Sequence, residues 1–293
     1  MKTPKRFTVT EDNCWMLENR DVTVAVEKKT GLMRSLVWKK AQVDLFDLLR
    51  QNMAGYAGYA RVFDEHAGRW FDPLHDRCRV TKAYKRGGKV HLRRKYAEAE
   101  FALEETLELS DESLMWTVRA EKTASKVADR SLRVGFNVPM QAGWDVWAPC
   151  LTGEFTFDGL DSFNFNHVQI TFVSPNEIIL PMVSHYSKAA DVGYSLVEPI
   201  ADKVPAARFH YENADRLFNW GYNEKPVEKA PTLEALNYYI GLVGDRAMET
   251  RVELMFHEGD WRPGVGKVYQ KYQEYFDPNS KAIYDYEGVF ACS

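Results

Sequence analysis

The sequence is poor in the features that mark membrane proteins, disulfide-rich secreted proteins and nucleic-acid binders. Its four cysteines in 293 residues form no CxxC pair, so neither a disulfide framework nor a zinc site is indicated, and free thiols are expected. No run reaches the roughly 18 apolar residues of a membrane-spanning helix. The 38 basic and 42 acidic residues give a net charge of −4, without the basic excess that a nucleic-acid partner or an anionic membrane surface requires.

Targeting and cofactor motifs are also missing. The first residues are basic, but no apolar run follows them, so a signal peptide is not predicted. We therefore expect a cytoplasmic protein if Met1 is the native start, and a secreted one if the chain was trimmed. No phosphate-binding glycine motif, GxSxG, HExxH or EF-hand loop is found, and we expect no cofactor. The stretch FDEHAGRWFDPLHD (63–76) is rich in Asp and His but irregularly spaced, so a solvated, turn-rich loop is favoured over a metal site.

What the sequence does contain is alternation of apolar and polar residues, which is typical of β-strands. Alternation runs from Val22 to Val26 and is followed by a turn at Thr30-Gly31. Two alternating runs at 99–109 and 114–122 predict a hairpin. About fifteen strands are indicated, with turn signals every ~8–12 residues, no internal repeat and no linker before residue 258. We predict an all-β protein: a large antiparallel sandwich of two broad sheets spanning residues 1–258. Segment 41–52 fits a helix or a loop with one turn equally well.

One stretch departs from this pattern: EGDWRPGVGKVYQKYQEYFDP, residues 258–278. Asp260 suits the cap of a helix, and Pro263 suits its first turn. Helical spacing predicts an amphipathic helix at 262–276, with part of its apolar stripe packed on the sandwich and part exposed. The glycines of Gly264-Val265-Gly266 match no phosphate-binding motif and indicate close packing of the helix on a sheet. The stripe comprises Val265, Val268, Tyr269, Tyr272, Tyr275 and Phe276.

Four short stretches combine aromatic residues with carboxylates, amides or histidines. They are GWDVWAPC (143–150), FNFNH (163–167), HYSK (185–188) and FNWGYNEK (218–225), all on predicted loops. An indole can stack on the C–H face of a sugar while neighbouring carboxylates and amides bind its hydroxyl groups. Ordinary packing is the alternative for each stretch, and we expect Trp144 and Trp147 to be at least partly exposed if they bind sugar. The candidate carbohydrate-binding residues are Trp144, Asp145, Trp147, His185, Tyr186 and Trp220.

A strand-rich region closed by GDWRPG and an aromatic helix resembles the N-terminal region of certain bacterial glycoside hydrolases. VTVAVEKKTGLMRSLVW (22–38) and IILPMVSHYSKAADVGYSLVEP (178–199) look like stretches of the same group. The resemblance implies a galactose-mutarotase-like super-sandwich at 1–258. Residues 259–293 would form a linking helix and the first strand, YEGVFACS, of a (β/α)8 barrel absent from this chain. The catalytic carboxylates would lie on that barrel, so this chain would be a non-catalytic part of a hydrolase.

Two alternatives remain open at this point. The first is a stand-alone aldose epimerase, in which His185, His167 or His257 would exchange protons together with Glu253 or Asp145. Asn166-His167 is only a fragment of the motif that such enzymes carry. The second is a structural sandwich without a ligand. The expected partners are a carbohydrate, the downstream barrel domain and, through an exposed C-terminal end, a second copy of the chain.

Overall fold

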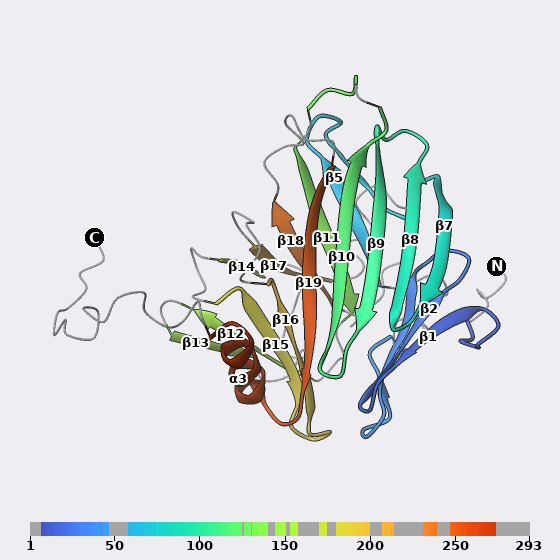
Figure 1. Ribbon diagram of the computed structural model, residues 1–293. Helices are drawn as coiled ribbons and strands as arrows, with labels where there is room; N and C mark the ends of the chain where they lie inside the picture. The colour runs from blue at the N-terminus through green and yellow to red at the C-terminus, as the bar shows by residue number, and fades with distance from the viewer. Residues whose placement is uncertain are drawn as a thin grey trace, which may run out of the picture.

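Strands make up nearly all of the regular structure (Figure 1). The computed structural model describes residues 7–46, 58–74, 76–124, 126–129, 131–139, 144–150, 153–157, 170–174, 180–199, 207–213, 231–238 and 247–273. In these ranges, nineteen strands and one helix are found, and the strands form three sheets. The expected mostly antiparallel β-protein with one substantial helix is therefore confirmed.

Within each of the three sheets, neighbouring strands are hydrogen-bonded in the following spatial order. The four-stranded sheet consists of β1 (Cys14–Glu18), β2 (Val22–Glu27), β3 (Met33–Trp38) and β4 (Val43–Asp44). The nine-stranded sheet consists of β13 (Gly153–Phe157), β12 (Asp145–Cys150), β15 (Met182–Ser187), β16 (Val192–Val197), β19 (Ala247–His257), β10 (Ser113–Lys122), β9 (Phe101–Leu109), β8 (Lys89–Tyr96) and β7 (Cys78–Arg86). The six-stranded sheet consists of β14 (Ile170–Ser174), β17 (Ala207–Asn213), β18 (Pro231–Tyr238), β11 (Leu132–Pro139), β5 (Tyr59–Asp64) and β6 (Arg69–Phe71).

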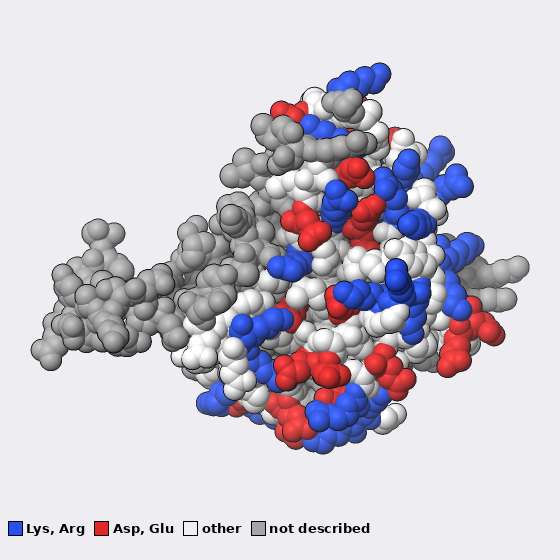
Figure 2. Space-filling view, viewed as in Figure 1, with Lys and Arg blue, Asp and Glu red and all other residues white. Residues whose placement is uncertain are grey.

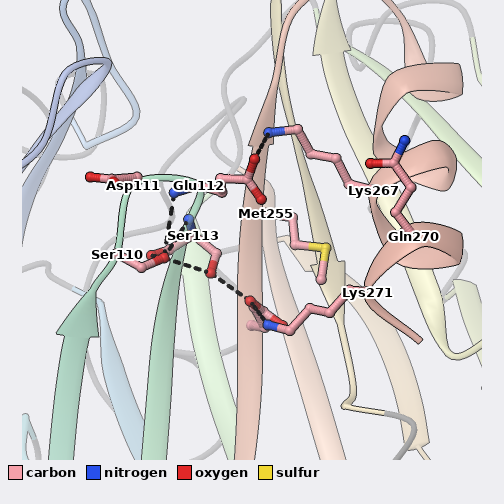
Figure 3. A pocket seen from close by; sticks show the side chains of 9 residues that line it. Ser110, Asp111, Glu112, Ser113, Met255, Lys267, Gln270 and Lys271 are labelled. Atoms are coloured by element: carbon pink, nitrogen blue, oxygen red, sulfur yellow. Dashed lines mark hydrogen bonds and ion pairs between the residues drawn. The ribbon is translucent and has the colours of Figure 1, made fainter. Parts of the chain in front are cut away.

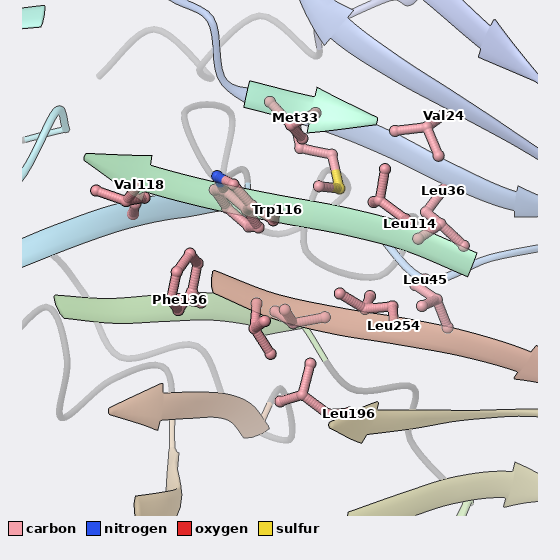
Figure 4. Packing of buried hydrophobic residues seen from close by; sticks show 14 of the residues in the cluster. Val24, Met33, Leu36, Leu45, Leu114, Trp116, Val118, Phe136, Leu196 and Leu254 are labelled. Atoms are coloured by element: carbon pink, nitrogen blue, oxygen red, sulfur yellow. The ribbon is translucent and has the colours of Figure 1, made fainter. Parts of the chain in front are cut away.

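The two large sheets pack face to face, as a sandwich requires. Trp116 of β10 and Phe136 of β11 meet edge to face with ring centroids 5.4 Å apart. Leu114, Trp116 and Val118 are buried on one face of β10, which confirms the predicted hairpin of β9 and β10. Side chains of the four-stranded sheet, such as Leu36, join the same core (Figure 4). This small third sheet is the difference from the two sheets expected.

A buried ion pair ties the four-stranded sheet to the nine-stranded one. Arg94 of β8 pairs with Glu105 of β9, and both side chains are almost fully buried. The Arg94 guanidinium also donates to the carbonyl oxygens of Thr30 and Gly31. Gly31 has φ 67°, a left-handed conformation that suits glycine, so the predicted Thr30-Gly31 turn is confirmed. Because Arg94 binds the turn backbone, it fixes the place where the first sheet meets the second.

The helix α3 (Trp261–Lys271) begins where predicted and lies on the outer face of the nine-stranded sheet (Figure 1). The Asp260 carboxylate accepts a hydrogen bond from the backbone N–H of Arg262 at 3.0 Å, which confirms Asp260 as the cap. α3 ends at Lys271, earlier than the predicted residue 276, and residues 274–276 lie outside the described ranges. Across the part of the chain that the structure covers, no helix has both the length and the apolar character needed to span a membrane.

Two local expectations need correction. In the stretch 63–76, Arg69–Phe71 form strand β6, and Asp64 and Asp72 are buried rather than solvated. The Asp64 carboxylate accepts hydrogen bonds from the backbone N–H groups of His66 and Ala67 in the turn that follows β5, and these bonds compensate its burial. In segment 41–52, the described part contains the short strand β4 and no helix, and residues 47–52 lie outside the described ranges.

Candidate functional site

The four candidate sugar-binding stretches are expected on loops, but the described parts of two of them lie mainly in strands. Asp145–Cys150 form β12 in the interior of the nine-stranded sheet, and His185 to Ser187 belong to β15. The glycine and proline of GWDVWAPC suggested a loop, yet Pro149 is tolerated inside a strand here. The loop assignment is therefore wrong for 145–150 and for 185–187. FNFNH, FNWGYNEK and Trp220 lie outside the described residues.

Alternation along these strands separates the candidate residues onto the two faces of the sheet. Trp144 belongs to the core between the sheets, and its ring lies 6.2 Å from that of Tyr194. His185 also points inward, with its ring 4.8 Å from Tyr194. Trp147 and Tyr186 instead belong to the apolar cluster under α3. The candidates therefore do not form one binding surface.

Both indoles are buried, so the expectation that Trp144 and Trp147 are partly exposed is wrong. Their exposed fractions are 5% and 4%. Trp147 is covered because it stacks on Trp261 of α3, with ring centroids 4.1 Å apart and planes 1° from parallel. The only outer-face candidate with a charge is Asp145, which forms an ion pair with Lys188 at 3.1 Å. The surface that could have accepted a sugar ring at Trp147 is occupied by the helix.

A chain of hydroxyl groups and an imidazole lies directly beneath α3. The Ser184 and Ser195 hydroxyls are 2.7 Å apart, and Ser195 Oγ lies 3.2 Å from His257 Nε2. His257 Nδ1 lies 3.3 Å from the carbonyl oxygen of Glu258, which can only accept, so Nδ1 carries the proton and Nε2 accepts from Ser195. Gly264 packs directly against these hydrogen-bonded groups. A Cβ at this position would lie 2.9 Å from His257 Nε2 and still closer to Ser195 Oγ. The predicted close packing of the glycine pair is thus confirmed for Gly264.

An open groove of about 530 Å³ runs beside α3 (Figure 3). Its walls are the β9–β10 turn, strand β19 and the helix residues Lys267, Gln270 and Lys271. At its base Glu253, only 1% exposed, accepts hydrogen bonds from Ser113 Oγ and Lys271 Nζ, both at 2.5 Å, and from Tyr272 Oη at 3.3 Å. Three donors compensate the buried carboxylate, so Glu253 fastens the helix to the sheet.

The titratable groups considered for proton transfer do not meet. Burial lowers the pKa of His185 to about 3, with a smaller contribution from His257. Burial likewise lowers the pKa of His257 to about 4. His185 faces the core, whereas Glu253 and Asp145 lie on the outer face, so the sheet separates these partners. His257 shares the outer face with Glu253, but its two ring nitrogens are taken up by Ser195 and Glu258. His167 lies outside the described residues.

In the ranges that the structure describes, neither a cluster of metal-binding side chains nor a reactive thiol is present. There, no three His, Cys, Asp or Glu side chains converge as a metal site would need. Cys14 and Cys78 are free thiols, and burial raises the pKa of each. A raised pKa keeps a thiol protonated and unreactive. Neither thiol therefore has the character of a nucleophile.

One polar residue on the six-stranded sheet was missed from sequence. Asn137 of β11 is fully buried, and among the described residues its amide oxygen and nitrogen have no hydrogen-bond partner. Its neighbours Phe136 and Val138 point into the core, so Asn137 points to the opposite face. On the same face, the Arg61 guanidinium of β5 lies 4.0 Å from the centre of the Trp70 ring. The signal was present in SLRVGFNVP, where one polar residue stands between two core residues.

Comparison with known proteins places the fold. No family model and no curated protein sequence matches the chain. Among solved structures, a galactose mutarotase-like protein from Lactobacillus casei is 11% identical with a TM-score of 0.54, covering 83% of this chain and 100% of that one. The GalM/aldose epimerase homologue from Caenorhabditis elegans is 9% identical with a TM-score of 0.55, covering 84% and 99%. The galactosidase domain of α-galactosidase-sucrose kinase is 11% identical with a TM-score of 0.54, covering 85% of this chain and 41% of that one.

These matches confirm the predicted galactose mutarotase-like sandwich. The same architecture occurs as a whole protein and as part of a larger enzyme. At these identities the likeness concerns the fold, and fold alone does not fix the reaction.

Proposed function

We propose that this chain is a carbohydrate-related sandwich domain without catalytic residues of its own, placed before the catalytic barrel of a glycoside hydrolase. On this proposal residues 259–293 lead from the sandwich into the barrel. The observation that carries it is that no candidate acid and base can act together: His185 faces the core, and on the outer face Glu253, Asp145 and His257 are each bound by neighbouring groups. The match to a galactosidase domain, of which this chain spans 41%, supports the same role.

The chemistry of glycoside hydrolysis explains why the arrangement of these groups matters. A glycosidase needs two carboxyl groups facing one bond, about 5–5.5 Å or 6.5–9.5 Å apart. Of the outer-face carboxylates, Glu253 is bound by three donors and Asp145 by Lys188. Neither is available as a pair for a substrate. Glu253 instead holds α3 against β19, a structural role that suits a supporting domain.

The helix offers the surface for the barrel. Val268 and Tyr272 pack on the sheet, whereas Tyr269 is 46% exposed on α3. An exposed aromatic next to a chain continuing into a further domain would be covered by that domain. In its absence, the same surface would promote pairing of two copies.

The test compares the chain alone with the product of the full reading frame. We expect residues 1–293 to release no product from aryl-glycosides and to leave the rate of galactose and glucose mutarotation, followed by polarimetry, at the buffer value. The reading frame should continue for a few hundred residues, and the longer protein should hydrolyse a glycoside. Hydrolysis by residues 1–293 that is abolished by one carboxylate substitution within them would refute the proposal, as would a stop codon directly after Ser293.

A second function, stand-alone sugar epimerisation, is favoured by one observation. A buried amide with unpaired oxygen and nitrogen is costly, and such groups often mark a ligand site. Asn137 fits this description, and Arg61 of the neighbouring strand lies on the same face. If the chain accelerates mutarotation and Asn137→Ala removes at least nine-tenths of that acceleration, epimerisation replaces the first proposal.

A further inference from the structure

A second cavity is lined by residues of β7, β8 and β9. These strands lie at the far end of the nine-stranded sheet from β15 and β16, on which α3 packs (Figure 1). The volume of this cavity is about 250 Å³, and it opens on the outer face of strands β7, β8 and β9. Neither the proposed barrel nor the epimerase alternative uses this part of the molecule. The side chains that matter for its chemistry are Lys82, Tyr84, His91, Arg93, Glu104 and Thr106.

The cavity contains a fixed aromatic platform. Tyr84 is 38% exposed, and it is one of two large hydrophobic side chains exposed in the described ranges. Its ring stacks on that of His91, with centroids 4.8 Å apart and planes 20° from parallel. His91 is held in turn by Thr106, whose Oγ1 lies 3.2 Å from Nδ1. An exposed ring held from behind is suited to stacking on the C–H face of a ligand ring.

The surroundings of this platform are basic. Residues 77–97 contain nine Lys and Arg and no Asp or Glu. Some of these charges are neutralised: Arg93, for example, pairs with Glu104 at 2.8 Å and with Glu121 at 3.0 Å. Others have no carboxylate partner among the described residues, and in Figure 2 basic side chains gather on this side of the face. The basic residues of 77–97 without an ion pair to a described carboxylate are Arg77, Arg79, Lys82, Lys85, Arg86 and Lys95.

The side chains that line this cavity indicate which class of anion it can bind. Lys82 Nζ lies 5.1 Å from the centre of the Tyr84 ring, so an anion bound by Lys82 would sit beside a ring stacked on Tyr84. Glu104 in the same lining pairs with Arg93 at 2.8 Å and with Arg119 at 3.3 Å, and the remaining lone pairs of its carboxylate can accept hydrogen bonds from hydroxyl groups. Thr106 adds a hydroxyl that can donate or accept. A ring with one carboxylate and several hydroxyl groups satisfies all of these groups, and a volume of about 250 Å³ suits a single sugar ring.

We propose that this cavity binds a uronate residue of an acidic polysaccharide. The sugar ring stacks on Tyr84, its carboxylate pairs with Lys82, and its hydroxyl groups bind Glu104 and Thr106. The site is separate from the groove beside α3, so it can be tested without reference to any hydrolase or epimerase activity.

The test is a calorimetric titration of the full chain with trigalacturonate, with the neutral trisaccharide galactotriose as the matched ligand. We expect millimolar binding of trigalacturonate, at least tenfold weaker binding of galactotriose, and weakening as the salt concentration rises from 50 to 300 mM. Tyr84→Ala and Lys82→Gln should each weaken the binding of trigalacturonate at least tenfold. Tyr269→Ala removes the other exposed aromatic and should leave binding unchanged.

Several results would overturn the proposal. They are absence of binding by the unaltered chain, equal affinity for both trisaccharides, or an unchanged affinity in Tyr84→Ala. A polyglutamate peptide and ATP test for attraction by charge alone. If either binds the unaltered chain as tightly as trigalacturonate does, and binds Tyr84→Ala equally tightly, the basic residues around Tyr84 attract anions by charge alone. Circular dichroism of each variant verifies its fold, which the surface position of both side chains should preserve.

Discussion

At the scale of single residues, the two buried histidines make the stability of the fold depend on pH. Burial lowers the pKa of His257 to about 4 and that of His185 to about 3, whereas an exposed histidine titrates near 6.5. The unfolded chain therefore binds more protons than the folded chain at pH values below about 6.5. The contribution of the two neutral histidines to the free energy of unfolding is complete above pH 6.5. It is lost as the pH falls from about 6.5 towards 4 for His257 and towards 3 for His185.

We expect the free energy of unfolding, measured with urea at pH 7, 6, 5 and 4, to fall by up to about 1.4 kcal/mol per pH unit for each histidine. His185→Phe keeps a ring against Tyr194 and removes one titrating group. The slope of the free energy of unfolding against pH should therefore decrease between pH 6 and 4 by the contribution of one proton, about 1.4 kcal/mol per pH unit. The control Val183→Ala, on the same face of β15, changes no titrating group and should leave the slope as it is. An equal slope in His185→Phe would contradict this account.

The tryptophans show where prediction from sequence reached its limit at this scale. That Trp144 and Trp147 flank a carboxylate is visible in the sequence, but which face of the sheet each one points to depends on strand register. The burial of Trp147 depends further on Trp261, more than 100 residues away, which stacks on it. A local pattern does not contain such a long-range contact. Asn137 is the converse case, because its unusual position could be read from the pattern and its lack of a partner could not.

At the scale of elements, α3 was the best-predicted segment, because a helix start depends on neighbouring residues. Asp260 caps it, and Gly264 permits its close approach to Ser195 and His257. Strands such as β12 were harder to predict, since Gly143 shortly before it and Pro149 within it also suit loops. Strand pairing over long sequence distances, such as β10 with β19, could not be read from the sequence at all.

The glycine pair of α3 allows a matched comparison. A methyl group at Gly264 would overlap with Ser195 and His257, whereas one at Gly266 meets nothing within 4 Å. We expect Gly264→Ala to lower the free energy of unfolding by about 1–2 kcal/mol, because overlap outweighs the better helix propensity of alanine. Gly266→Ala gains the propensity alone and should raise it by up to about 1 kcal/mol. Urea unfolding of both variants measures the difference, and equal stabilities would mean that α3 is not docked closely on the sheet.

At the scale of the whole molecule, one apolar core is shared by all three sheets. Its members include Leu36 of the four-stranded sheet, Leu254 of the nine-stranded sheet and Val134 of the six-stranded sheet. The small sheet is therefore part of the sandwich and not an independent unit. That residues 1–258 form one large domain stays a prediction, which rested on the lack of a linker before residue 258.

A shared core predicts one cooperative unfolding transition. Leu36→Ala and Leu254→Ala should each lower the free energy of unfolding by about 2–5 kcal/mol and shift the same single transition, followed by circular dichroism and calorimetry. The control Glu249→Ala changes an exposed residue and should have an effect within about 0.5 kcal/mol. Two transitions, of which only one responds to Leu36→Ala, would mean that the sheets unfold separately.

The exposed strand β7 has a consequence for how the protein behaves at high concentration. Within the part of the chain that the structure describes, β7 is a terminal strand of the nine-stranded sheet, and such a strand offers backbone groups on which another chain could add a strand. The register shift between Val80 and Lys82 interrupts this edge, and the basic side chains along β7 repel the same edge of a second molecule. Fibril-like growth from strand to strand is thereby opposed at β7 by charge and by shape.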